Sequence, residues 1–143
     1  MKKWVVGGIA VLMVGVLAGC GSAGSGGKKG EAPREVRVVN SMMAFDTKEM
    51  TLTKGQPVTL VLDNKDSMLH DLSVEQMPVS GKKESSAGDH GHGGGNKLTV
   101  HVSADPGKTG SVEFTPTQSG TYTYYCTVAG HREAGMVGKV VVN

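Results

Sequence analysis

The chain has 143 residues, with 15 lysines and arginines against 13 aspartates and glutamates, for a formal net charge of +2. This length suits one ordinary domain. The near balance of charge offers no basic face for nucleic acid and no acidic bias, so we expect no nucleic-acid partner.

The first segment, residues 1–19, has the composition of an export signal. Lys2 and Lys3 form a short basic start, and an apolar stretch follows over residues 4–16. That stretch is shorter than the about 20 residues of a membrane span. The sequence LAGC at residues 17–20 resembles the lipobox of bacterial lipoproteins, which implies cleavage before Cys20 and a lipid on its thiol. A plain signal peptide that happens to end in cysteine, or an uncleaved anchor, remains the alternative.

The segment after Cys20 is rich in glycine and serine as far as residue 30. Such a composition behaves as a flexible coil. We therefore expect residues 20–34 to be a linker that holds a folded domain off the membrane. Loss of Lys2 and Lys3 with the signal would leave 13 basic and 13 acidic residues, so the choice of partner must depend on local surface and not on net charge.

From residue 35 onward the sequence predicts an all-β domain that extends to residue 143. Short runs rich in valine, threonine and leucine alternate apolar with polar residues and are separated by glycine, proline, asparagine and aspartate, which is typical of half-buried strands. No stretch has a helical period. We expect an antiparallel Greek-key β-sandwich. Its predicted strands are residues 35–39, 49–53, 58–63, 71–76, 97–103, 110–115, 121–126 and 137–142.

One segment, residues 78–96, interrupts this pattern because it has almost no apolar residues. We expect a flexible surface loop there. Its His90 and His92 could bind a second, labile metal ion, although incidental histidines in a solvated loop are the simpler interpretation. His101 falls on the polar side of its predicted strand, where we expect it to be exposed.

The candidate functional site is a set of metal-binding side chains late in the chain. Cys126, His131 and Met136 follow one another at steps of five residues between two predicted strands, and His70 lies where an earlier strand begins. If Cys20 carries lipid, Cys126 is a lone thiol in an oxidising compartment, where an unpaired cysteine is expected to be reactive, intermolecular or bound.

These residue types suit copper. A thiolate and two imidazoles with a weak thioether accommodate both Cu(I) and Cu(II). Zinc is the nearest competitor, since cysteine and histidine bind it readily. A thioether is a poor zinc ligand, however, so zinc would need a water molecule or a carboxylate such as Glu133.

In its ligand spacing the sequence resembles the cupredoxins, the plastocyanin-like type 1 blue-copper proteins. Over about residues 36–143, and above all in YYCTVAGHREAGMVGKVVV at residues 124–142, it is similar to sulfocyanin, auracyanin and rusticyanin. This resemblance implies one copper ion, with His70, Cys126 and His131 as equatorial ligands and Met136 as the axial ligand.

The resemblance also implies where electrons enter and leave. In the family the histidine of the C-terminal ligand loop has its ring edge near an apolar surface. By this likeness His131 takes that role, with Met68, Ala129, Gly130 and Gly135 around it. Two departures from the family bear on the reduction potential and on loop rigidity. Asp71 stands where many members have an asparagine that helps to tie the two ligand loops together. Ala129 stands where proline is common.

The residues around Cys126 exclude richer copper chemistry. Tyr125 and Thr127 occupy the positions where a multicopper oxidase needs histidines, and Gly130 stands where a binuclear site needs a second cysteine. The sequence places no Ser-His-Asp arrangement, so we expect neither an enzyme nor a small-molecule substrate.

We therefore predict a one-electron carrier, lipid-anchored outside the cytoplasm at a bacterial cell membrane or in the periplasm. Its partners would be redox proteins, such as a c-type cytochrome or a membrane-bound oxidase or reductase. The alternative is a chaperone or buffer that delivers Cu(I) to an acceptor outside the cytoplasm.

Overall fold

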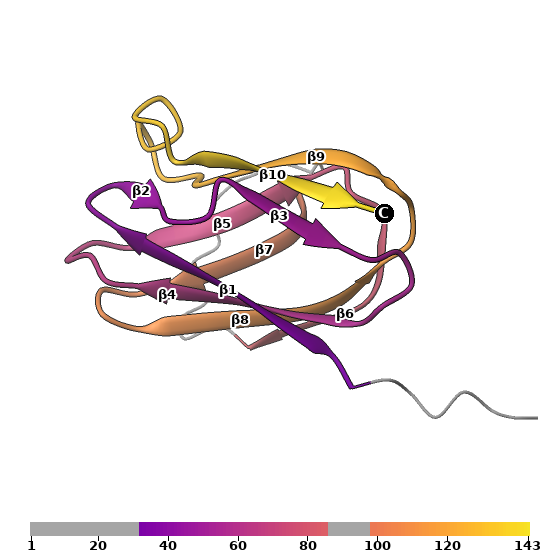
Figure 1. The fold of residues 1–143 in the computed structure, drawn as a ribbon. Helices are drawn as coiled ribbons and strands as arrows, with labels where there is room; N and C mark the ends of the chain where they lie inside the picture. Colours follow the sequence, from indigo (N-terminus) through magenta and orange to yellow (C-terminus); the bar gives the residue numbers. More distant parts are fainter. Residues whose placement is uncertain (1–31, 86–97) are drawn as a thin grey trace, which may run out of the picture.

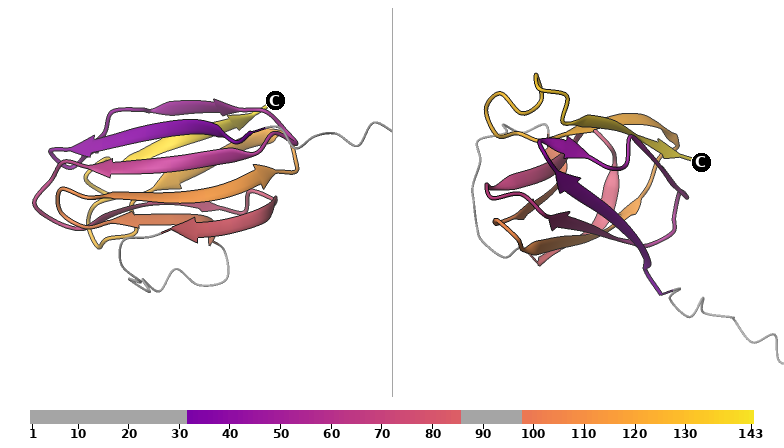
Figure 2. Two further views of the ribbon diagram at one scale, coloured as in Figure 1. Left: turned by 90° about the horizontal axis from the view of Figure 1, so that it is seen from below. Right: turned by 60° about the vertical axis from the view of Figure 1, so that its left-hand side comes forward.

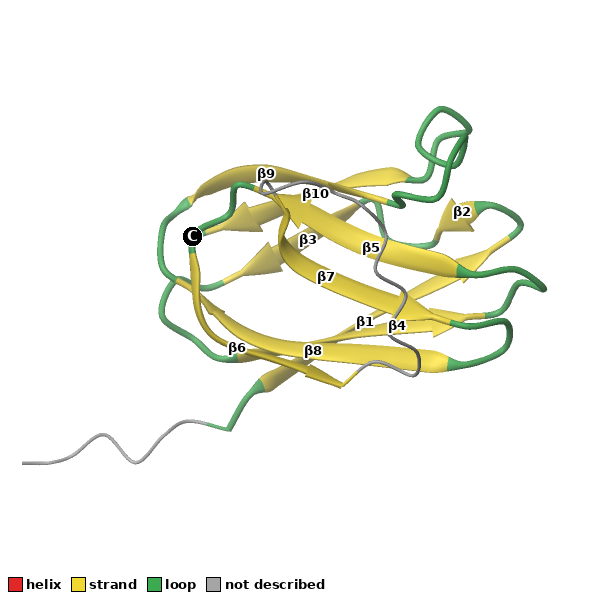
Figure 3. Ribbon diagram, turned by 180° about the vertical axis from the view of Figure 1, so that it is seen from behind, coloured by secondary structure: helices red, strands yellow, loops and turns green. Residues whose placement is uncertain are grey.

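The structure is a computed structural model that describes residues 32–85 and 98–143. The predicted signal, Cys20, most of the linker, His90 and His92 lie outside the described residues. Two five-stranded sheets face each other (Figure 1). The described part of the chain has no helix (Figure 3), and therefore no helix that could cross a membrane. The prediction of an all-β sandwich is confirmed.

Each sheet takes strands from both halves of the chain. The first sheet has the order β2 (Ala44–Phe45), β1 (Arg34–Ser41), β4 (Val58–Asn64), β8 (Thr109–Pro116) and β6 (Val79–Ser85). The second sheet has the order β3 (Glu49–Leu52), β10 (Val137–Val142), β9 (Gly120–Tyr125), β5 (His70–Glu75) and β7 (Leu98–Ala104). Consecutive strands therefore often lie in different layers, as the two views of Figure 2 show.

The expectation of antiparallel pairing needs correction at two places, because β1 pairs with β4 and β3 pairs with β10 in parallel. Between β1 and β4 the chain crosses to the other sheet to form β3, so it returns running in its original direction. The alternation of apolar and polar residues is the same in both kinds of pair, and for that reason the pattern could not distinguish them.

The core lies between the sheets and is built from the apolar positions of the alternating strands. β8 shows this directly, since its burial alternates along the whole strand and places Val112 and Phe114 inside. Phe45 packs edge-on against Tyr124, with ring centroids 5.4 Å apart. Burial of each such side chain stabilises the fold by roughly 1.5–3 kcal/mol.

The prediction of a loop over residues 78–96 is wrong for its first part, because Val79–Ser85 forms the edge strand β6. This strand pairs antiparallel with β8 and has an irregularity between Ser80 and Lys83. An edge strand outside the core needs no apolar face, and charged residues there discourage pairing with other molecules. The polar composition that predicted a loop is therefore that of an exposed strand.

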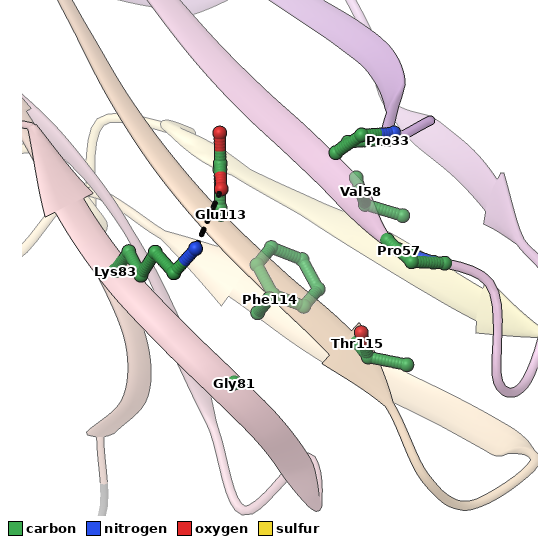
Figure 4. A pocket seen from close by; sticks show the side chains of 8 residues that line it. All are labelled: Pro33, Pro57, Val58, Gly81, Lys83, Glu113, Phe114 and Thr115. Atoms are coloured by element: carbon green, nitrogen blue, oxygen red, sulfur yellow. Dashed lines mark ion pairs between the residues drawn. The ribbon is translucent and has the colours of Figure 1, made fainter. Parts of the chain in front are cut away.

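The two ends of the sandwich differ. Loops β1–β2, β4–β5, β7–β8 and β9–β10 gather at one end, on the left in Figure 1. A shallow groove of about 240 Å³ lies toward the other end, where the side chains of Lys83 and Glu113 approach to 3.9 Å (Figure 4). Its lining includes Pro33 and Pro57, at the start of β1 and β4, and no candidate ligand.

Candidate metal centre

The loop from Cys126 to Met136 is folded back on itself by its own backbone. Cys126 N–H donates to the carbonyl of Met136, and Met136 N–H donates to the carbonyl of His131, at 3.1 and 3.0 Å. Gly130 and Gly135 take positive φ values of 82° and 100°, which glycine adopts without steric cost. These turns bring the three predicted ligands of the loop to the ends of β9 and β10.

His70 joins them from the neighbouring strand. It is the first residue of β5, beside β9 in the same sheet. The Nδ1 atoms of His70 and His131 lie 3.1 Å apart, and Cys126 Sγ lies 3.4 Å from His131 Nδ1 and 3.9 Å from His70 Nδ1. Both rings thus present the same nitrogen to one sulfur atom.

All three side chains are buried, with exposed fractions of 0% for His70, 0% for Cys126 and 6% for His131. They form the group of His, Cys, Asp and Glu side chains that could hold a metal ion in the described part of the chain. Met136 is also fully buried and belongs to the same hydrophobic core cluster as Cys126. The structure therefore brings His70, Cys126 and His131 together, with Met136 bonded through its backbone to both ligand residues of its loop.

Burial changes the protonation of two of these groups. It raises the pKa of the Cys126 thiol to about 11, against the opposing effect of the Asp71 N–H directed at the sulfur. Burial, followed by the proximity of His131, lowers the pKa of His70. The metal-free site thus holds a neutral thiol and a neutral imidazole at pH 7, and a metal ion that binds the thiolate must displace a proton.

The measured spacing fits a single first-row metal ion. Metal–nitrogen and metal–sulfur distances of about 2.0 and 2.3 Å, as for zinc, place three ligands in a trigonal plane roughly 3.5–3.7 Å apart. The observed separations of 3.1–3.9 Å bracket this value. Two imidazole nitrogens and a cysteine sulfur close together, with the buried thioether side chain of Met136 on the same loop, are the donors expected for a blue-copper site.

Sequence reasoning missed the carboxylate behind His70. Asp66 Oδ2 lies 3.0 Å from His70 Nε2, the nitrogen on the far side of the ring from Cys126. Asp66 also accepts hydrogen bonds from the backbone N–H groups of Met42 and Met43, which lower its pKa although burial opposes them. A carboxylate at the second nitrogen of a ligand histidine orients the ring and strengthens it as a donor.

Two buried asparagines hold the loop that carries Asp66. Asn64 accepts a hydrogen bond from Asn40 at 2.8 Å and from Asp66 N–H at 2.9 Å, and donates to the carbonyls of Met68 and Ala104 at 2.8 Å each. Asn40 and Asn64 are register partners in the parallel β1–β4 pair. No sequence signal reveals this network, because it depends on a pairing that the sequence does not specify.

Asp71 ties the two ligand-bearing segments together, although it is an aspartate where the resemblance implies an asparagine. Its carboxylate accepts hydrogen bonds from Thr127 N–H at 2.9 Å and from the Thr127 hydroxyl at 2.6 Å. Its own backbone N–H points to Cys126 Sγ at 3.5 Å. Because Asp71 follows His70 and Thr127 follows Cys126, these bonds fix the two strands relative to each other at the ligands.

The predicted electron-transfer residues lie at the same end of the sandwich. Met68 has an exposed fraction of 46%, and Ala129, Gly130 and Gly135 are exposed around the nearly buried His131. These five residues are called the ligand-loop surface below. It combines a ligand ring close to solvent with small or apolar neighbours.

Comparison with known proteins shows the family of the chain. Residues 33–143 match the copper binding proteins of the plastocyanin/azurin family. The chain is 32% identical to auracyanin-A of Chloroflexus aurantiacus, over 94% of each chain. It is also 32% identical to the copper-resistant cuproprotein CopI of Rubrivivax gelatinosus, over 83% of this chain and 72% of that protein.

A solved structure of auracyanin A, described as a "blue" copper protein from Chloroflexus aurantiacus, superposes with a TM-score of 0.59. It is 25% identical in sequence, and the match covers 78% of this chain and all of that one. The predicted resemblance to cupredoxins, auracyanin included, is thereby confirmed, whereas the likeness to sulfocyanin and rusticyanin stays a prediction. The chain is a cupredoxin, a member of the plastocyanin/azurin family of copper-binding proteins, and its cofactor is copper.

Proposed function

We propose that the protein is a mononuclear type 1 copper protein that carries single electrons between redox proteins. The observation that carries this proposal is the buried cluster of His70 Nδ1, Cys126 Sγ and His131 Nδ1, with all separations between 3.1 and 3.9 Å. Copper bound there would supply the one-electron Cu(I)/Cu(II) couple. The protein would act as a carrier and not as an enzyme.

Each of the four donor residues would have a distinct role as a copper ligand. His70, Cys126 and His131 would be the equatorial ligands and Met136 the axial ligand. Because Cys126 and Met136 are fully buried and joined by a backbone hydrogen bond, the donors would keep their positions when the charge of the site changes. A site that need not rearrange exchanges electrons at low cost.

Electrons would pass through the ligand-loop surface, since His131 is the ligand with some exposure to solvent. Its small apolar area suits brief encounters, which bury less surface than stable complexes. A c-type cytochrome or a membrane-bound oxidase or reductase would fit as partner. Met68→Glu should slow electron exchange without changing the copper spectrum, whereas Thr117→Glu, exposed in the turn after β8, should leave the rate unchanged.

We further propose that the protein is a lipoprotein outside the cytoplasm, anchored through Cys20 after removal of residues 1–19. The LAGC sequence and the glycine- and serine-rich residues that follow support this. A tether would raise the concentration of the domain near membrane-bound partners. Mass spectrometry of the protein from bacterial membranes should find an acylated Cys20 as the first residue, and Cys20→Ser should release the protein. An unmodified Cys20 in the membrane fraction would contradict the anchor.

A second candidate function is copper delivery, because the chain is 32% identical to a protein named as a copper-resistant cuproprotein. The buried, four-donor arrangement favours the carrier, since a chaperone gains from an open site with fewer ligands. The two functions separate in one comparison on the copper-loaded protein: the rate of electron self-exchange against the rate of Cu(I) release to a chelator. Fast exchange with slow release supports the carrier, and the reverse would support delivery.

A further inference from the structure

A chain of hydrogen-bonded side chains runs across the outer face of the second sheet, from the copper site to the edge strand β7. Building on the proposed function, we propose that Ser73 and His101 are positioning residues for the Asp71 carboxylate, and that proton uptake by His101 raises the reduction potential of the site. The observation behind it is the unbroken contact from His101 through Ser73 to Asp71.

The contacts are short and specific. His101 Nδ1 lies 2.8 Å from Ser73 Oγ, and the Ser73 hydroxyl donates to Asp71 Oδ1 at 3.0 Å. His101 and Ser73 are direct register partners in the β5–β7 pair. Ser73 and Asp71 are two residues apart on β5, so both side chains point to the same face of the sheet.

This order of residues fixes the proton on the histidine ring. A serine hydroxyl has one proton, and Ser73 gives it to Asp71. The nitrogen Nδ1 of His101 must therefore be the donor to Ser73, and Nε2 is the atom that takes up a further proton. Since His101 is only partly buried, protonation at Nε2 charges the ring and leaves the hydrogen-bonded chain intact.

The far end of the chain lies at the ligands. The same Asp71 carboxylate accepts two hydrogen bonds from Thr127, next to Cys126, and the Asp71 N–H is directed at the Cys126 sulfur. Its negative charge contributes to the raised pKa of that thiol. Asp71 and Ser73 are both fully buried, so the interaction is weakly screened by solvent.

The arrangement does not amount to a hydrolytic triad. Such a site needs a histidine between an acid and an accessible serine, whereas here the serine lies between the other two and is 0% exposed. The expectation of an exposed His101 is wrong, because the side chain is partly buried and contacts Ser73.

In the described part of the chain, the other charged or titratable groups near this face have partners of their own. Tyr125 on β9 donates its hydroxyl to Glu75 on β5, and Arg132 lies over the Tyr125 ring at 4.0 Å. β6, which packs beside β7, carries Lys82 and Glu84, 2.8 Å apart, and Lys83, 3.9 Å from Glu113 of β8. The groups to be considered with His101 are Asp71, Glu75, Tyr125, Arg132, Lys82, Lys83, Glu84 and Glu113.

The sign of the effect follows from electrostatics. Reduction adds one negative charge to the site, and the Asp71 carboxylate opposes it. A positive charge on His101, bonded to that carboxylate through Ser73, offsets this opposition and favours the reduced protein. The potential is therefore high while His101 is protonated and falls as the pH rises through its titration.

The test measures the reduction potential of the copper-loaded protein by spectroelectrochemistry between pH 5 and 8.5. His90 and His92 are replaced by glutamine in every sample, so that they contribute no titration. At a fixed applied potential, the ratio of reduced to oxidised protein should fall about threefold or more across this range.

Two variants separate bonding from charge. In His101→Asn the side-chain amide can still donate to Ser73 but cannot titrate, so the potential should stay at the high-pH value throughout. In Ser73→Ala the link is cut while His101 still titrates, so the pH dependence should shrink. Equal pH dependence in the parent and His101→Asn, with the thiolate-to-copper absorption intact, would overturn this inference alone. Loss of that absorption already in the parent would overturn the proposed function together with it.

Discussion

Replacement of Asp66 by asparagine should raise the reduction potential of the copper site. The carboxylate lies 3.0 Å from His70 Nε2 and is only 17% exposed. Asparagine has the same shape, and its carbonyl oxygen can still accept the hydrogen bond from Met42 N–H. Its amide nitrogen cannot accept the hydrogen bond that Oδ2 receives from Met43 N–H. The substitution therefore removes both the charge and the acceptor behind His70, and both losses weaken that histidine as a donor.

The size of the effect follows from the distance. A charge 3.0 Å beyond Nε2 lies about 7 Å from an ion bound at Nδ1. At an effective dielectric constant of about 20–80, a unit charge at ~7 Å contributes roughly 0.6–2.4 kcal/mol. Since a tenfold change in a one-electron equilibrium is about 59 mV, the potential should rise by about 25–100 mV.

The assay is a redox titration of the copper-loaded protein followed by its visible absorption. Asp63→Asn is the matched control, because Asp63 is 16% exposed but its carboxylate is paired with Lys65 at 2.9 Å and Arg37 at 3.7 Å, and not with a ligand. Its potential should change much less than that of Asp66→Asn. Equal shifts in the two variants, or a lower potential in Asp66→Asn, would refute the role given to Asp66.

Three further predictions concern the ligand loop and the scaffold. Met136→Leu preserves a buried apolar side chain, so the copper-free protein should unfold at nearly the same temperature while the potential of the loaded protein rises through loss of a donor; an unchanged potential would remove Met136 from the ligand set. Gly138→Ala places a Cβ 2.3 Å from Tyr124 Cζ and should destabilise the protein by about 1–3 kcal/mol or more, whereas Lys139→Ala, exposed on the same strand, should be nearly neutral in urea unfolding. Burial raises the pKa of Tyr124 to about 12; since the neutral phenol is favoured in the folded state, this contribution is complete below about pH 10, where an unfolded tyrosine titrates, and is lost toward pH 12. The free energy of unfolding of copper-free protein should fall over this window and fall less steeply in Tyr124→Phe; identical slopes would contradict the assignment.

The sequence predicted the sandwich because alternation of apolar and polar residues is a local property. The pattern in β8, with Val112 and Phe114 inside, can be seen in seven or eight consecutive letters. The strand β6 was not predicted because a strand exposed on both faces lacks the alternation of apolar and polar residues, and its lysines and serines are then typical of a loop. The parallel direction of the β1–β4 and β3–β10 pairs was not predicted because it depends on long-range topology.

The site was predictable to a similar degree. Cys126, His131 and Met136 lie close together in the sequence, so their spacing is visible, and His70 was found because it lies where a predicted strand begins. The residues behind the ligands were not visible in this way. Asp66, Asn64 and Ser73 have ordinary polar side chains whose roles arise only when distant strands pair, as Asn40 with Asn64 and His101 with Ser73 do.

The central claim is that Cys126 provides a thiolate to a copper ion that exchanges single electrons. The most direct measurement adds Cu(II) to the copper-free protein, carrying Cys20→Ser to remove the second thiol, and records its visible spectrum. An intense thiolate-to-copper band should appear, bleach with one electron equivalent, return on oxidation, and be absent in Cys126→Ser. A weak, nearly colourless tetragonal spectrum, or the same band in Cys126→Ser, would contradict the account.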